Sequence, residues 1–152
     1  MIDQTKLPGQ LVFVEYNDYN QVADAIRNLV VRGAPAIGVS GAFGLALAAL
    51  QSNSTEKDEL INDLKKAKQI LFETRPTAVN LGWGLDQIMK VAQSGNSVDE
   101  IKNLVVKAAK KMANDDIEIN KTMGKFGAEL FESNDTITVS YTHLTLPTNR
   151  EV

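Results

Sequence analysis

Apolar and polar residues follow one another in a pattern that predicts a mainly α-helical protein with one short β element near its start. Residues 11–16 are β-branched and aromatic and are bounded by turn residues on both sides, which is typical of a strand. The best partner for this strand is the segment before Pro8, because Pro8-Gly9 marks a turn. We therefore expect the β element to lie within residues 1–16.

Beyond this element the apolar residues recur three or four positions apart, which predicts five consecutive helices. The first runs over roughly 20–30, and Asp18 with Gln21 has the spacing of an N-terminal capping box. The second begins at Pro35 and ends near Leu50. The connections between the helices are short, so we expect an antiparallel helical bundle.

The third and fourth helices are separated by the sequence Thr74-Arg75-Pro76-Thr77. A residue that precedes a proline disfavours helical backbone, so the third helix should end here. Thr77 can cap the fourth helix, and Gly95 should end it. The apolar stripes that define these two helices are Leu60, Leu64, Ala67 and Leu71, and Ala78, Leu81, Leu85, Ile88 and Ala92.

The fifth helix has the clearest start, since Ser97 and Glu100 form a second capping-box pattern. Its apolar stripe continues to about residue 131. The pair Asp115-Asp116 marks the expected bend or exposed turn. Asp135 to Val139 is a candidate start of a further strand.

The second helix is unusual because Gly38, Gly41 and Gly44 recur along it. A glycine in a helix interior is less favourable than alanine by roughly 1 kcal/mol. Close contact with another backbone along this ridge is the simplest compensation. The run from Pro35 to Leu50 has 16 residues without a charge, which is short of the roughly 20 needed to span a bilayer. A central buried helix is therefore favoured over a membrane span.

The residues at the start of this helix form a candidate anion site. Pro35 suits the first turn of a helix, where its missing N–H is not needed. The N–H groups of Gly33 and Ala34 then lie at the positive end of the helix dipole, and Arg32 adds a guanidinium. This combination can bind a phosphate or a carboxylate. The alternative is a tight turn into a buried helix, with Arg32 in an ordinary salt bridge.

Other residues that could take part in catalysis or binding have simpler structural explanations. Trp83 lies between two glycines that leave room for its ring, so we expect it to pack in the core. The carboxylates at Asp115-Asp116 and Glu118 have no histidine nearby, so a solvated face is expected rather than a metal site. His143 is the single histidine and lies close to the C-terminus, so histidine-based acid–base chemistry is not expected.

Composition narrows the class of protein. The 152 residues suit one domain, and 16 basic against 19 acidic residues give a net charge of −3. A nucleic-acid-binding protein would need a clustered basic face, which the sequence lacks. The chain has no cysteine, which excludes thiolate chemistry and fits a cytoplasmic protein. No signal peptide is visible at the start, and we expect no membrane attachment.

Two segments go beyond generic helices: residues 30–38, with the sequence V-V-R-G-A-P-A-I-G, and residues 74–81, with the sequence T-R-P-T-A-V-N-L. Together with D-Q-T-K-L-P-G at residues 3–9, they resemble the S-methyl-5-thioribose-1-phosphate isomerases. Those enzymes belong to the family that also contains the regulatory subunits of translation initiation factor 2B. The resemblance covers roughly residues 2–137.

The resemblance implies a methionine-salvage enzyme that converts 5-methylthioribose 1-phosphate to 5-methylthioribulose 1-phosphate without a metal or organic cofactor. It also implies a helical N-terminal domain, here residues 1–137, followed by a larger Rossmann-like domain, usually in a homodimer. In such enzymes the R-G-A segment and the arginine of R-P-T-A-V-N bind the sugar phosphate. Carried over, these substrate-binding residues are Arg32, Gly33, Ala34 and Arg75, in agreement with the candidate anion site.

The chain also departs from the family pattern. Residues 138–152 look like translated sequencing adapter rather than the family's L-T-H-C-N-A-G segment, so an aberrant tail is expected there. The family's catalytic cysteine, its catalytic aspartate and its Rossmann-like domain are missing from this sequence. We therefore expect an N-terminal fragment in which Arg32 and Arg75 bind phosphate but which is inactive alone.

Two other functions stay open at this point. A regulatory subunit of a translation-initiation exchange factor would act through protein contacts, and two phosphate-facing arginines argue against it. The sequence also does not distinguish the methylthioribose-phosphate isomerases from a related isomerase for another pentose 1-phosphate, such as 5-deoxyribose 1-phosphate.

Overall fold

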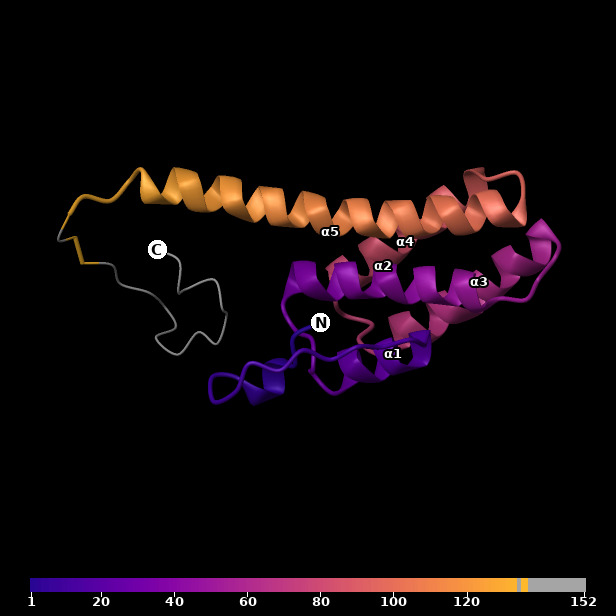
Figure 1. Cartoon of the computed structure of the whole chain (residues 1–152), viewed down its shortest axis with the longest axis horizontal. Coiled ribbons are helices and arrows are strands. Elements are labelled where there is room, and N and C mark those ends of the chain that lie inside the picture. The colour runs from indigo at the N-terminus through magenta and orange to yellow at the C-terminus, as the bar shows by residue number, and fades with distance from the viewer. Residues whose placement is uncertain (134, 137–152) are drawn as a thin grey trace.

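The computed structural model describes residues 1–133 and 135–136, which form a bundle of five α-helices (Figure 1). They are α1 (Tyr19–Arg27), α2 (Ala34–Gln51), α3 (Lys57–Glu73), α4 (Val79–Ser94) and α5 (Val98–Ala128), preceded by a 3₁₀ turn, η1 (Gln4–Lys6). The mainly helical prediction is confirmed. The predictions about His143, about a strand reaching Val139 and about the tail at 138–152 lie outside the described residues.

The N-terminal segment pairs with the partner that the sequence predicts, but through a single bridge rather than a ladder. Ile2 and Phe13 lie opposite each other in antiparallel orientation. The Asp3 N–H donates to the Val12 carbonyl at 2.9 Å. Leu11 and Phe13 are exposed, so this segment has no buried face that would favour a longer strand.

The predicted caps of α1 and α5 form. Asp18 accepts a hydrogen bond from the Asn20 N–H at 2.6 Å, and Ser97 Oγ accepts one from the Glu100 N–H at 3.2 Å. The Glu100 carboxylate in turn accepts from the Asn96 N–H at 2.8 Å, one residue before the cap. These contacts satisfy N–H groups that the first turn of a helix leaves without partners, and they fix where each helix begins.

The cap predicted at Thr77 is wrong. The residue that caps α4 is Ala78, which makes no side-chain hydrogen bond. Its N–H donates to the Arg75 carbonyl at 3.0 Å, so a tight turn carries the chain one residue past the threonine before the helix starts. Turn geometry, rather than a polar cap, sets the beginning of α4.

The central position of α2 is confirmed, because this helix packs against α1, α3, α4 and α5. Its length and apolar composition would be enough to cross a membrane. Here the other helices surround it (Figure 1), and residues such as Leu45 and Ala49 are fully buried. An apolar helix that other helices cover on several sides is typical of the core of a helical bundle.

Two glycines allow the backbones of α2 and α4 to touch, as the glycine ridge predicts. A Cβ at Gly38 would lie 2.7 Å from the Asn80 carbonyl oxygen, and a Cβ at Gly84 would lie 2.6 Å from the Gly38 carbonyl oxygen. At Gly41 the same space is filled by the Leu81 side chain, 2.7 Å away. Only the first part of the ridge therefore meets another backbone.

The bend predicted at Asp115-Asp116 does not form, because α5 is one unbroken helix. Lys111 and Asp115 form an i,i+4 ion pair across this stretch, which favours continued helix. The first half of α5 lies against the bundle, whereas its second half extends past the ends of the other helices (Figure 1).

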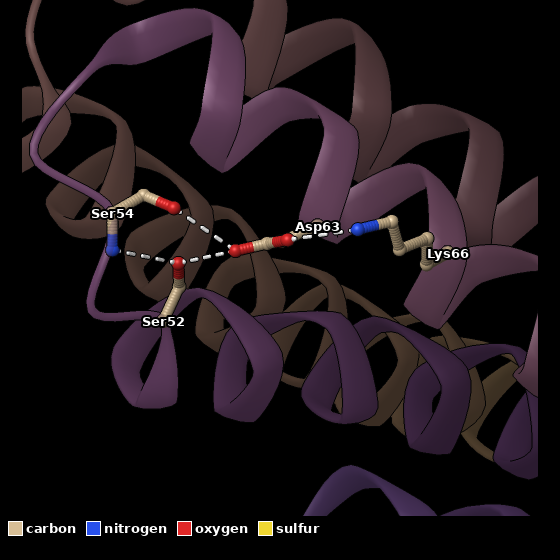
Figure 2. A network of polar contacts seen from close by, with 4 residues as sticks. All are labelled: Ser52, Ser54, Asp63 and Lys66. Atoms are coloured by element: carbon tan, nitrogen blue, oxygen red, sulfur yellow. Dashed lines mark hydrogen bonds and ion pairs between the residues drawn. The ribbon is translucent and has the colours of Figure 1, made fainter.

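A polar network ties the C-terminal end of α2 to α3 (Figure 2), and a lysine of α5 joins it. Asp63 accepts hydrogen bonds from the hydroxyls of Ser52 at 2.8 Å and Ser54 at 3.0 Å. These two bonds hold the pKa of the Asp63 carboxyl below its ordinary value. Lys66 approaches the other carboxylate oxygen at 3.5 Å, and Lys102 of α5 donates to the Ser52 carbonyl at 2.7 Å. The network closes the end of the bundle opposite to the arginine motifs.

Candidate functional site

The starts of α2 and α4 lie at the same end of the bundle. Gly38 is one turn inside α2 and Asn80 is the second residue of α4, and the two approach closely. One turn further along α2, Gly41 meets Leu85 of α4. The contacts thus advance along both helices together, and the positive ends of two helix dipoles face the same region.

The loop that leads into α2 is held by the N-terminal segment. The Gln4 side-chain amide donates to the Arg32 carbonyl at 2.7 Å, and the Gln4 N–H donates to the Val30 carbonyl at 2.9 Å. Gly33 then caps the helix with a φ of 104°, which favours glycine. Its carbonyl accepts the first helical hydrogen bond from the Ile37 N–H at 2.9 Å.

The first turns of α2 and α4 receive no hydrogen bond from an N-cap side chain. Their N-cap residues are Gly33 and Ala78, which have no polar side chain, and Pro35 lies in the first turn of α2. Backbone N–H groups at such a helix start point outward along the helix axis and favour anions. Both helix starts therefore have the chemistry of an anion site.

The four predicted binding residues accompany these helix starts. Arg32, Gly33 and Ala34 are exposed, and Arg75 is half-buried in the turn that leads into α4. The Arg75 N–H donates to the Phe72 carbonyl at 3.2 Å, which fixes the backbone of that turn. The structure brings the two segments to one end of the α2–α4 pair. That the two guanidinium groups hold one ligand stays a prediction.

A cleft of about 540 Å³ adjoins the helix starts and is lined by residues of α2, α4 and α5. Pro35 and Asn80, which belong to the two arginine motifs, line it. The remaining wall is largely apolar and consists of Gly38, Val39, Trp83, Gln87, Ile88, Val91, Ala108, Lys111, Met112, Asp115, Asp116 and Ile119. A cleft of this size, with a few polar groups on an apolar wall, is typical of small-molecule sites.

Trp83 forms part of this wall, so the prediction that it packs in the core is wrong. Its side chain is 54% exposed. The flanking glycines accommodate other neighbours, since Gly84 meets the α2 backbone and a Cβ at Gly82 would lie 3.4 Å from the Phe72 ring. The sequence does contain the relevant signal, because Trp83 lies off the buried stripe Leu81, Leu85, Ile88 and Ala92.

Two acidic residues of α5 take part in ion pairs with lysines on the same helix. Lys111 pairs with Asp115, and Lys121 pairs with Glu118 at 3.0 Å. In the part of the chain that the structure describes, no three His, Cys, Asp or Glu side chains are arranged to hold a metal ion. The carboxylates of Asp115 and Asp116 line the cleft and are polar contacts within its largely apolar wall.

Comparison with known proteins identifies the family. The sequence profile of the initiation factor 2 subunit family matches residues 30–146. The chain belongs to this family. The matched range contains both arginine motifs and the helices α2 to α5. Because the match extends past residue 137, the expected domain boundary at that residue stays a prediction.

Individual members of the initiation factor 2 subunit family that resemble this chain carry two kinds of name. Methylthioribose-1-phosphate isomerase of Acetivibrio thermocellus is 46% identical over 139 residues, which cover 90% of this chain and 41% of that protein. The crystal structure of 5-methylthioribose 1-phosphate isomerase from Pyrococcus horikoshii OT3 is 46% identical, with a TM-score of 0.82 over 86% of this chain and 37% of that one. The crystal structure of translation initiation factor eIF-2B, subunit delta, from A. fulgidus is 48% identical, with a TM-score of 0.83 over 89% of this chain and 40% of that one.

These likenesses confirm the helical fold over the part of the family that the chain represents. The chain spans about 40% of the length of the relatives it matches. The activities in the names of these relatives therefore belong to proteins longer than this chain.

Proposed function

We propose that this chain is the phosphate-binding part of a methylthioribose-1-phosphate isomerase. The proposal rests mainly on the crossing of α2 and α4 at Gly38 and Gly84, which brings two arginine-bearing helix starts to one end of the bundle. The isomerase names of two relatives that are 46% identical support it. The full-length enzyme would convert an aldose 1-phosphate to a ketose 1-phosphate without a metal or organic cofactor, as a cytoplasmic homodimer.

The proposed site binds a phosphate through charge and through geometry. Arg32 and Arg75 supply planar guanidinium groups that form paired, charge-assisted hydrogen bonds with phosphate oxygens. The N–H groups of Gly33 and Ala34 add donors at the positive end of a helix. Gly33 is needed for two reasons: a side chain would be strained at its φ of 104°, and it would stand where the phosphate approaches the backbone.

The chemistry of the substrate explains why phosphate binding alone gives no turnover. The anomeric oxygen carries the phosphate, so the sugar ring does not simply open to a free aldehyde. Moving hydrogen between C1 and C2 needs an acid or base held at the carbon in a sheltered site. Binding groups without reacting groups stabilise the ground state and the transition state about equally. We therefore expect the 152-residue chain to bind the sugar phosphate without converting it.

The second candidate is a regulatory subunit of an initiation-factor complex, which would act through protein contacts. The name of the A. fulgidus structure, 48% identical to this chain, favours it. The two candidates differ in what they require of the arginines. A sugar-phosphate site needs Arg32 and Arg75 to bind one ligand, whereas a scaffold does not.

Calorimetric titration of the chain with 5-methylthioribose 1-phosphate tests the proposal. Hydrogen bonds to charged groups are worth about 1.5–3 kcal/mol, so Arg32→Ala and Arg75→Ala should each weaken binding at least about tenfold. Arg27→Ala is the matched control, because Arg27 is exposed at the end of α1 and pairs with Asp24. Equal binding by all three variants and the wild type would contradict the proposal and favour the scaffold.

A further inference from the structure

The wall of the cleft between α2, α4 and α5 contains an exposed tryptophan, Trp83, which phosphate binding does not explain. We propose that this cleft receives the 5-substituent of the sugar phosphate, and that Trp83 makes the site selective for an apolar thioether over a hydroxyl group. The proposal rests on the proposed function, because it assumes that the phosphate lies at the starts of α2 and α4.

The cleft lies next to the starts of both helices. Pro35 of the first turn of α2 and Asn80 of the first turn of α4 both line the cleft. A pentose 1-phosphate has its phosphate at C1 and its variable substituent at C5, on opposite sides of the ring. A ligand whose phosphate lies at the helix starts therefore places its other end in the adjoining cleft.

The wall of the cleft around Trp83 is apolar. Trp83 lies among apolar side chains of all three helices, including Val39 of α2, Val91 of α4 and Met112 of α5. A methylthio group is apolar and polarisable, and sulfur makes favourable contacts with aromatic rings. A hydroxyl group seated against the Trp83 ring and these aliphatic side chains would lose hydrogen bonds to water, because they offer it no acceptor. This wall therefore favours the thioether.

The indole ring of Trp83 is exposed to solvent. Trp83 is 54% exposed although it lies on a helix that buries Leu81, Leu85 and Ile88. A ligand seated in the cleft would cover this ring and remove its apolar surface from water, which is favourable. The polar lining group Gln87 stands one turn further along α4 and can bind a ring hydroxyl.

The chain contains one tryptophan, so its fluorescence reports on Trp83 alone. We expect 5-methylthioribose 1-phosphate to shift the emission to shorter wavelength and to bind at least about tenfold more tightly than ribose 1-phosphate, in which a hydroxyl replaces the thioether. Inorganic phosphate should shift the amide NMR signals of Gly33 and Ala34 without changing the emission.

Trp83→Leu should abolish most of the preference for the thioether while inorganic phosphate binding stays unchanged. Leu50→Ala is the matched control, since Leu50 is 56% exposed at the other end of α2 and should alter neither property. Equal affinity for the two sugar phosphates, or a preference that survives in Trp83→Leu, would overturn the cleft proposal and leave the phosphate site intact. A chain whose Gly33 and Ala34 signals respond to no phosphate would overturn the proposed function and this inference with it.

Discussion

The two halves of α5 share an apolar stripe at helical spacing but have opposite surroundings. In the first half, Ile101 and Val105 are fully buried, and the helix packs against α2 and α4. In the second half, Ile119, Met123 and Phe126 are 57%, 59% and 63% exposed. This half extends past the ends of the other helices (Figure 1). The same pattern thus produces a core in one place and an uncovered apolar face in the other.

The glycines show the same contrast. A Cβ at Gly38 or Gly84 would collide with a neighbouring backbone, whereas one at Gly124 or Gly127 would meet no atom of the described residues within 4 Å. Periodicity therefore predicts which face of a helix is apolar, but it does not predict whether that face is buried.

Truncating one apolar side chain in each half of α5 tests the comparison most strongly. Ile101→Ala should lower the free energy of unfolding by about 2–5 kcal/mol, because it leaves a cavity in the core. Met123→Ala should change it by no more than about 0.5 kcal/mol, because that side chain is exposed. Urea denaturation followed by circular dichroism measures both. Similar losses in the two variants would show that the second half of α5 is covered in solution.

Replacing a glycine by alanine should change the stability in opposite directions at the contact of α2 with α4 and in the second half of α5. Gly84→Ala should destabilise the bundle by about 1–3 kcal/mol, because the Cβ would force α2 and α4 apart. Gly124→Ala should stabilise it by up to about 1 kcal/mol, because alanine is the better helix former and has open space there. The same denaturation curves measure these changes. Destabilisation by Gly124→Ala would indicate that another backbone approaches that face.

The polar network at Ser52 joins the packed half of α5 to the rest of the bundle, and its contribution should depend on pH. The pKa of Asp63 is lowered in the folded state by the hydroxyls of Ser52 and Ser54. Its stabilising effect is therefore complete above the ordinary value of 3.8 and is lost as the pH falls through the lower folded value.

Asp63→Asn should accordingly lower the melting temperature slightly at pH 6 and much less at pH 2.5. The effect is expected to be small because this carboxylate is partly exposed to solvent. Melting curves of the two proteins across this range give the comparison. A difference in melting temperature that does not change with pH would contradict the assigned role.

Local signals were sufficient to predict where most helices lie. The stripe of α3 is buried as expected, and so is the stripe of α4 from Leu81 to Ala92. The side chains of Asp18 and Ser97 form the caps that their spacing indicates. These features depend on residues close together in the chain. The glycine contacts of α2 were also predictable, because glycines inside a helix need a compensating neighbour.

Features that depend on distant segments were not predictable in the same way. Whether Trp83 points into the core depends on which neighbours occupy the two flanking glycines, and only the fold supplies Phe72 and the α2 backbone. The turn at Arg75 displaces the cap from Thr77 by one residue. For the candidate site, the motifs gave the residues, and the crossing of α2 with α4 gave their common location.

The central claim is that the starts of α2 and α4 serve one anion, and amide NMR tests it most directly. The Gly33 N–H reports on the start of α2, whereas Arg75 belongs to the turn before α4. If both bind the same phosphate, Arg75→Ala should raise the concentration of 5-methylthioribose 1-phosphate that half-shifts the Gly33 signal by at least about tenfold. An unchanged midpoint at Gly33 would show that the two segments do not share a ligand, and it would contradict the account.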